Sequence, residues 1–204
     1  MVWLTVAGVL ALAYVAFLFW YGGRGRPLDP DETADLLGQL AAYCHTEQDR
    51  AVLEQVRELV AQDDGREFVM QNLVRYRAKA LYPPGHDFDD DPRKADQRYG
   101  RAIIGPLLRY GNHPVFIARR SGRFIDFDGA EQWHYVAMVR YRSRRDFLRF
   151  ALTIEQKDIA MHKWAAIEKT HVFPVQPLVN LVLVRTVVGG LLLLAGIGLA
   201  RLAA

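Results

Sequence analysis

Apolar residues are concentrated at the two ends of the chain. No charged side chain occurs from Val2 to Gly23, and Arg185 is the only one from Val172 to Ala200. About 20 apolar residues in a helix span the hydrocarbon core of a bilayer, which is roughly 30 Å thick. The pattern therefore predicts a transmembrane helix over residues 1–23 and a second one over residues 177–204, with Arg185 at the membrane interface.

The first apolar run is interpreted as an uncleaved anchor rather than a signal peptide. No basic residue precedes it, and it ends in the bulky sequence Phe17-Leu18-Phe19-Trp20-Tyr21, whereas signal peptidase needs small residues. Trp20 and Tyr21 are typical of the aromatic belt at a membrane interface. Arg24 and Arg26 follow the run, so the positive-inside rule predicts a multi-pass protein whose central domain is cytoplasmic. Basic residues near both helices favour contact with membrane lipid.

Residues 24–65 are predicted to form a linker and a helical hairpin. Asp29 followed by Pro30 is typical of a helix start. Two runs of apolar residues at helical spacing follow, separated by a break near Cys44. Two arrangements stay open, because the hairpin can pack on the central domain or hold that domain away from the bilayer. The apolar positions are Leu36, Leu37, Leu40 and Tyr43 in the first helix, and Val52, Leu53, Val56, Leu59 and Val60 in the second.

Residues 66–176 alternate between strand and helix patterns. Strands are expected at 68–76, 113–118, 133–141 and 170–175, and helices at 95–110 and, with a kink, from Ser143 to Ile167. This order predicts an α+β, ferredoxin-like βαββαβ domain. Two helices on one face of the sheet leave the other face uncovered, so we expect two protomers to pack sheet to sheet as a homodimer.

Four short motifs in this region point to a known family. They are the strand Asn72-Leu73-Val74-Arg75-Tyr76, the helix start Arg98-Tyr99-Gly100, the segment from Trp133 to Arg144 with Phe147 next, and Ala160-Met161-His162-Lys163. The region resembles the small bacterial dimeric α/β-barrel proteins of unknown function, which are related to antibiotic-biosynthesis-monooxygenase-like barrels. The resemblance implies a pocket between sheet and helices in each protomer. With the terminal helices added, it implies a location in the bacterial inner (cytoplasmic) membrane.

Three residues are candidates for catalysis in such a pocket. The imidazole of His162 can transfer protons near neutrality, and the guanidinium of Arg140 matches a planar anion. The amide of Asn72 can polarise a carbonyl or hold dioxygen. The alternatives stay open: a surface histidine, an ion-paired arginine and a hydrogen bond at the strand.

Three further residues, Tyr99, Trp133 and His171, are candidates for ligand binding, although Trp133 also suits a core. Strand alternation places Asn72 on the same face as Met70 and Val74. In the third strand one face is expected to line the pocket and the other to meet the partner. The two sets are Trp133, Tyr135, Ala137, Val139 and Tyr141 on one face, and His134, Val136, Met138 and Arg140 on the other.

Composition and motifs limit the kinds of ligand and site that the chain is expected to have. A net charge of +3 is too small to indicate nucleic-acid binding, and the single cysteine, Cys44, excludes an intrachain disulfide. Cys44-His45 lacks the second ligand pair of a metal site, and the acidic run from Asp87 to Asp91 lacks the glycine spacing of a calcium loop. No phosphate-binding glycine loop or nucleophile elbow is present. We therefore expect no metal and no cofactor.

Three functional classes stay open. The first is a protein that binds, and in one version oxidises or isomerises, a small lipophilic molecule near the membrane. The second is a non-catalytic dimerisation module, and the third is an accessory subunit of a larger membrane complex. The apolar pocket that the resemblance implies favours the first.

Overall fold

A computed structural model describes residues 2–23, 25–178 and 183–202. The chain divides into two compact units. One is the central domain, Gly25–Gln176, and the other is made of the two terminal segments. Each unit is described by itself.

The central domain is built on a four-stranded sheet. Its order is β2-β3-β1-β4, and every neighbouring pair is antiparallel. Helix α4 connects β1 to β2, and α5 and α6 connect β3 to β4. This topology is the predicted ferredoxin-like arrangement, which is confirmed. The bounds are Phe68–Tyr76 (β1), Pro92–Arg109 (α4), His113–Arg119 (β2), Tyr135–Tyr141 (β3), Arg144–Gln156 (α5), Ala160–Ala166 (α6) and Ile167–Val175 (β4).

Local chemistry accounts for most of these boundaries. Asp91 caps α4 by accepting a hydrogen bond from the backbone N–H of Arg93, and Pro92 takes the first turn. Ser143 caps α5 in the same way through the N–H of Asp146. The predicted kink is a complete break, because Asp158 adopts a φ of 53° between α5 and α6. Ile167, expected to be helical, already pairs with Tyr76 as the first residue of β4.

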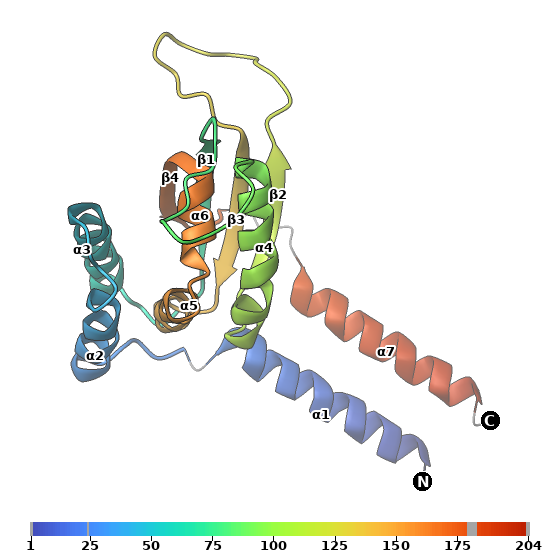
Figure 1. The fold of residues 1–204 in the computed structure, drawn as a ribbon. Coiled ribbons are helices and arrows are strands. Elements are labelled where there is room, and N and C mark those ends of the chain that lie inside the picture. The colour runs from blue at the N-terminus through green and yellow to red at the C-terminus, as the bar shows by residue number, and fades with distance from the viewer. Residues whose placement is uncertain (1, 24, 179–182, 203–204) are drawn as a thin grey trace. The chain divides into compact units, whose positions relative to one another are not determined.

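The helices α4, α5 and α6 cover one face of the sheet (Figure 1). Alternation along β1 directs Phe68, Met70, Asn72 and Val74 toward these helices, as the sequence predicts for Asn72. In β3 the inward residues are Tyr135, Val139 and Tyr141, so this set lies on the pocket side. Within Gly25–Gln176 no helix lies on the opposite face, where Phe116 of β2 is 51% exposed.

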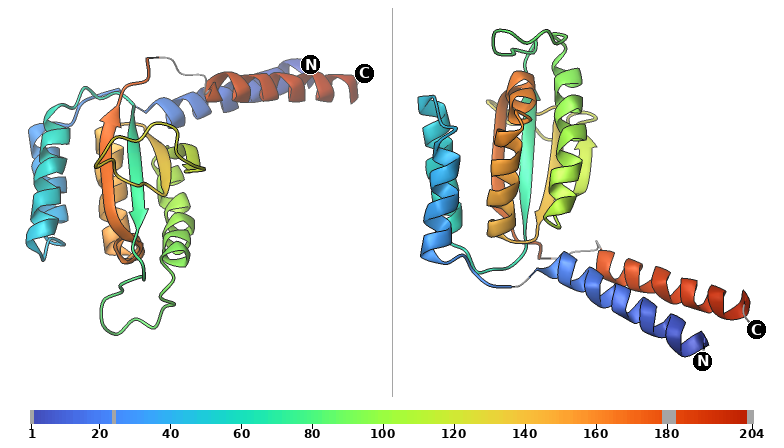
Figure 2. Two further views of the ribbon diagram at one scale, coloured as in Figure 1. Left: turned by 90° about the horizontal axis from the view of Figure 1, so that it is seen from above. Right: turned by 60° about the horizontal axis from the view of Figure 1, so that its bottom comes forward.

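The helical hairpin belongs to the same unit as the sheet. It consists of α2 (Pro30–Ala41) and α3 (Glu47–Ala61), and Thr46 and Asp49 form a capping box at the start of α3. The hairpin packs on the domain and stands beside α5 (Figure 2), which is the first of the two arrangements left open by the sequence. The shared apolar cluster contains Leu36, Leu37, Leu40, Leu53 and Val60 of the hairpin with Leu148 and Leu152 of α5.

The segment before the hairpin is held against the domain. The guanidinium of Arg145 donates to the carbonyl oxygens of Arg26 and Pro27 at 3.1 and 3.0 Å. The backbone N–H of Leu28 donates to the carboxylate of Asp63 at 2.7 Å. Gly65, at a φ of +73°, lies so close that an added Cβ would come within 2.6 Å of the backbone of Arg26. The predicted linker is therefore an ordered part of the domain from Gly25 onward.

The terminal unit contains two packed helices, α1 (Val2–Gly22) and α7 (Val184–Leu202). An added Cβ at Gly189 or Gly196 would meet the ring of Tyr14 at 3.2 Å or the side chain of Leu10 at 3.0 Å. These glycines thus permit a close approach of the two helices. The phenol of Tyr14 also donates to the carbonyl oxygen of Arg185 at 3.1 Å.

Only α1, among the described residues, is long and apolar enough to cross a membrane. In α7 the apolar stretch is shorter, Val184–Leu199, and part of the predicted second span, residues 179–182, lies outside the described residues. The predicted pair of spans is therefore matched by one helix, and length and composition support a single candidate.

Candidate functional site

The apolar core between sheet and helices is interrupted at Asn72. One cluster surrounds Phe68 and Met70 at the start of β1, and a second surrounds Val74 near its end. Asn72 lies between them, belongs to neither, and points toward the helices. A polar side chain in the middle of a buried face costs stability unless it is paired, so such a position is a candidate for function.

The amide of Asn72 is only partly paired. Its nitrogen donates to the carbonyl oxygens of Met70 at 3.0 Å and Ala137 at 3.3 Å. Its side-chain oxygen accepts no hydrogen bond from the described residues. Asn72 is therefore held in a fixed orientation, and its side-chain oxygen is open to hydrogen bonding.

Asp96 of α4 brings a carboxyl group to the same side of the sheet. It accepts hydrogen bonds from the phenols of Tyr76 at 2.8 Å and Tyr135 at 3.0 Å. Burial raises the pKa of Asp96, and the two phenol hydrogen bonds and nearby Lys163 offset part of this rise. The pKa values of both tyrosines are also raised, chiefly by burial and then by the Asp96 charge.

Lys163 of α6 and Tyr99 of α4 complete the group. Each is partly enclosed, and each has the carboxyl groups of Asp96 and Glu155 as its electrostatic neighbours. Burial lowers the pKa of Lys163 and raises the pKa values of Tyr99 and Glu155. Within the described residues Lys163 makes no ion pair, and its ammonium lies 4.9 Å from the centre of the Trp164 ring.

The arrangement, here called the polar gap, consists of Asn72, Asp96, Tyr99, Glu155 and Lys163. These side chains comprise an acceptor, two carboxyl groups of raised pKa, a phenol and an amine. These groups suit an apolar ligand that carries an oxygen atom. No cluster of three or more metal-ligating side chains is found in the described parts of the chain.

The structure brings together only two of the six predicted site residues. Asn72 and Tyr99 both face the polar gap. Tyr99 has Tyr135 and Tyr141 as electrostatic neighbours, and these two flank Ala137, the partner of Asn72 in β3. The other four lie elsewhere.

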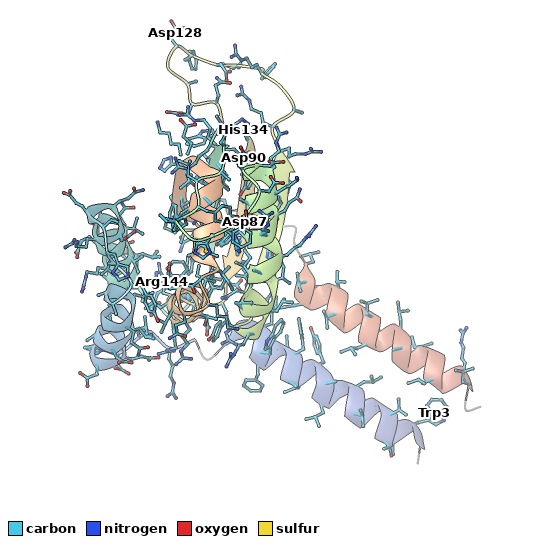
Figure 3. All side chains as sticks on the ribbon, viewed as in Figure 1. Trp3, Asp87, Asp90, Asp128, His134 and Arg144 are labelled. Carbon is cyan, nitrogen blue, oxygen red and sulfur yellow. The ribbon has the colours of Figure 1, made fainter. Side chains whose placement is uncertain are left out.

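His162 faces the loop between β1 and α4 rather than the polar gap. Its Nδ1 is 2.9 Å from the phenol oxygen of Tyr82, and its ring meets Phe88 edge-on. Burial, Arg98 and His86 lower its pKa. The same loop carries Asp87 and Asp90, which Figure 3 labels, and Asp90 pairs with Lys79.

Arg140 lies on the opposite side of the sheet. It is 4% exposed, forms an ion pair with Glu67 and donates to the carbonyl oxygen of Gly111 at 2.8 Å. This is the ion-paired arrangement that the sequence leaves open. Arg140 therefore has a structural role and does not belong to the polar gap.

Trp133 and His171 are also separate from the polar gap. Trp133 precedes β3, which begins at Tyr135 rather than at the predicted residue 133. His171 pairs with Leu73, so it lies on the face away from the helices, where its ring packs 4.9 Å from that of Phe173. This uncovered face is the one expected to meet a partner.

Sequence reasoning missed Lys163, Asp96 and Glu155. Lys163 lies in a motif that the sequence singles out, but the residue of that motif predicted to be catalytic is its neighbour His162. A signal existed, because Asp96 and Tyr99 are three residues apart and share one helix face. Which face of the short helix α6 turns inward could not be read from seven residues.

Comparison with solved structures finds a match to a protein of unknown function from Rhodopseudomonas palustris, RPA0582. The identity is 26%, the TM-score is 0.54, and the match covers 66% of this chain and 95% of that chain. The methylated form of the same protein matches at 27% identity over 66% of this chain and 93% of that chain, with a TM-score of 0.54. The chain thus shares its central fold with an uncharacterised protein.

A more distant match is a dabb family protein with a ferredoxin-like fold from Mesorhizobium loti. Its identity is 12% and its TM-score 0.36, over 58% of this chain and 100% of that chain, so it carries no argument here. No protein-family model and no curated protein matches the chain. The strand order of this chain itself establishes the ferredoxin-like topology.

The raised pKa of Asp96 predicts a pH-dependent stability. Protonation of Asp96 favours the folded state, so its contribution is greatest below the unfolded pKa of about 3.9. That contribution is lost as the pH rises through the folded pKa. The free energy of unfolding of the wild type, measured by urea denaturation relative to Asp96→Asn, should therefore fall between pH 3.5 and pH 7.

The matched control is Asp128→Asn, which alters a carboxylate on the exposed loop between β2 and β3 (Figure 3). It should not reproduce the pH-dependent difference. A difference between wild type and Asp96→Asn that rises with pH would contradict the assignment of burial as the dominant influence.

Proposed function

We propose that this chain is a membrane-anchored protein that binds a small lipophilic molecule, and that the oxygen atom of this molecule enters the polar gap. The observation that carries the proposal is that two groups lack a partner within the described residues: the partly enclosed amine of Lys163 makes no ion pair, and the side-chain oxygen of Asn72 accepts no hydrogen bond. A ligand oxygen would give both groups a partner.

Energetics supports a ligand rather than a purely structural role. Leaving a buried charged group unpaired costs several kcal/mol, and proteins avoid this by pairing or by function. The lysines Lys79, Lys94 and Lys169 have carboxylate partners at the surface, whereas Lys163 has none among the described residues.

The composition of the surroundings favours a largely apolar ligand. The clusters on either side of the polar gap are formed by aliphatic and aromatic side chains, including Met70, Leu107 and Val74. Such walls favour the apolar body of a ligand by about 25 cal/mol for each Å² removed from water. Polar groups at the centre then select its orientation and its oxygen function.

The proposal predicts charge-selective binding. With the full chain in detergent, 2-naphthoate should quench tryptophan fluorescence, because Trp164 is adjacent to Lys163. Lys163→Met should weaken naphthoate binding at least about tenfold, or about 1.4 kcal/mol, and should affect neutral 2-naphthalenemethanol less.

Lys157→Met is the matched control, since Lys157 is exposed at the end of α5. It should bind both probes like the wild type. Equal naphthoate affinity for Lys163→Met and the wild type would refute the proposed site.

We also propose that α1 anchors the chain in the bilayer and that the apolar stretch of α7 packs against it there. The close approach at Gly189 and Gly196 supports this pairing. Arg185 lies with its guanidinium 4.8 Å from the centre of the Tyr21 ring, which suits an interfacial position for both. We further propose that the central domain is cytoplasmic, because Arg24 and Arg26 follow the first span.

The anchor predicts resistance to extraction and a defined orientation. The chain should stay in the membrane fraction at alkaline pH. In a Cys44→Ala background, Ser121→Cys on the exposed β2–β3 loop should react with a membrane-impermeant maleimide in inside-out vesicles but not in right-side-out vesicles. Labelling of only the right-side-out vesicles would show the opposite orientation. Extraction of the chain at alkaline pH would contradict the membrane anchor.

A second proposal concerns the uncovered sheet face, which favours a homodimer. Strand register aligns four residues in one row across this face: Phe116, Met138, Gln71 and Phe173. Three of the four are apolar, and such a face is stabilised when a second copy covers it. A dimerisation role is compatible with ligand binding on the helix side.

The homodimer predicts a selective effect of charge on this face. Phe116→Asp should convert a dimer to a monomer in analytical ultracentrifugation of the detergent-solubilised chain. Leu108→Asp, at a residue of α4 that is 44% exposed on the helix side, should leave the dimer intact. If Leu108→Asp dissociates the dimer and Phe116→Asp does not, the interface is formed by the helices instead.

A further inference from the structure

Helix α4 presents one exposed face that is basic and apolar, here called the α4 outer face. Its exposed residues recur at helical spacing and therefore share one side of the helix: Gln97, Arg101, Ile104, Gly105 and Leu108. Arg109 is exposed beside them. The single carboxylate of α4, that of Asp96, is directed elsewhere and accepts hydrogen bonds from Tyr76 and Tyr135. The α4 outer face therefore carries positive charge that its own helix does not neutralise.

The arginines of this face have no carboxylate partner. Neither Arg101 nor Arg109 forms an ion pair with any residue that the structure describes, and the guanidinium of Arg109 lies 5.7 Å from the centre of the Tyr110 ring. At the start of the same helix, by contrast, Lys94 pairs with Asp89. The positive charges in the C-terminal half of α4 therefore remain available to an external anion.

Two apolar side chains stand between these arginines. Ile104 is 42% exposed and Leu108 is 44% exposed, and a spacing of four residues makes them neighbours on the helix surface. Helix α4 packs against α5, α6 and β2 (Figure 1) through the side that carries the buried residues Ala95 and Leu107. The exposed pair is thus on the side of α4 that faces away from the core.

The C-terminal end of α4 lies at the end of the domain where the chain enters from α1. Helix α1 ends at Gly22, and the domain begins at Gly25. Arg145, in the first turn of α5, holds the segment that follows Gly25 through two backbone carbonyl groups. The next residue, Asp146, accepts a hydrogen bond at 3.4 Å from the side chain of Asn112, which closely follows α4. The first turn of α5 thus joins the entry segment to the end of α4.

A bilayer surface fits this face better than a protein does. A stable protein–protein contact uses about 800 Å² and roughly 20–30 residues from each partner, far more than the α4 outer face offers. At a membrane surface a few residues suffice, because apolar side chains insert at the boundary between headgroups and acyl chains while basic side chains attract anionic lipid. An anchored chain also keeps such a face at high local concentration beside lipid.

We propose that the α4 outer face docks the central domain onto anionic phospholipid headgroups of the membrane that holds α1. This inference rests on the proposed anchor and adds a surface of the domain that contacts lipid. Arg101 and Arg109 bind the phosphate groups, and Ile104 and Leu108 insert beneath them. The polar gap lies on the same side of the sheet as α4, so docking brings that side toward the source of a lipophilic ligand.

Headgroup quenching tests the proposal on the full chain in lipid nanodiscs. In a Cys44→Ala background, Gly105→Cys attaches an NBD dye to the α4 outer face, where an added Cβ meets no atom within 4 Å. The nanodiscs contain phosphatidylcholine with a spin-labelled headgroup, with or without phosphatidylglycerol. Phosphatidylglycerol should raise the quenching at least about twofold, because each arginine near an anionic surface strengthens binding. Sodium chloride at about 0.5 M should remove this increase by screening.

Matched variants separate the α4 outer face from general basicity. Combined Arg101→Gln and Arg109→Gln should abolish the increase that phosphatidylglycerol causes. Arg93→Gln removes an exposed arginine at the start of the same helix and should preserve it. A dye at Ser121→Cys lies on the β2–β3 loop, at the other end of β2 from α4, and should show no dependence on phosphatidylglycerol.

Equal quenching at Gly105→Cys with and without phosphatidylglycerol would overturn the proposal. An emission change that instead follows protein concentration in lipid-free detergent would assign the face to a protein contact, and would overturn it as well. Extraction at alkaline pH separates these results from failure of the anchor. A chain that stays in the membrane fraction without a quenching difference refutes the docking alone, whereas a chain that is extracted refutes the anchor and the docking together.

Discussion

The burial of one face of the sheet against three helices is the constraint on which the domain depends. Alternation along β1 directs Phe68, Met70, Asn72 and Val74 to that face, and three of the four fill apolar clusters. Asn72 is the exception. It interrupts the core between the two apolar clusters of β1, on the face that the helices cover. The same alternation leaves the other face of the sheet open, so the ligand and a partner would use opposite faces.

Arginine residues stabilise the domain outside the polar gap. Arg140 joins the end of β3 to Glu67 and Gly111, and Arg142 pairs with Asp146 at 2.7 Å beside the cap of α5. Arg145 holds the segment that leads to the hairpin through Arg26 and Pro27. These contacts satisfy buried polar groups and fix α5, so polar residues have two different roles here. Pairing separates the roles: the arginines have carboxylate partners, and Lys163 does not.

On the short helix α6, the neighbouring residues His162 and Lys163 have different surroundings because they point in different directions. Successive helical residues point about 100° apart, so His162 meets Tyr82 of the loop, whereas the ammonium of Lys163 lies over the ring of Trp164. A histidine near neutrality is the usual candidate for proton transfer, which is why the sequence favours it. Enclosure, which a sequence does not display, makes the neighbouring amine the more distinctive group.

Short-range periodicity and caps such as Asp91 and Ser143 predicted the ferredoxin-like order of elements and the face on which Asn72 lies, although β3 begins two residues later than predicted and Ile167 belongs to β4. The sequence also marked α1 as apolar enough to span a bilayer. Only the tertiary structure decided that the hairpin packs on α5, that Arg140 is ion-paired and that Lys163 is enclosed. Those outcomes depend on contacts between residues far apart in the chain, and no local pattern encodes which distant side chain will be the neighbour.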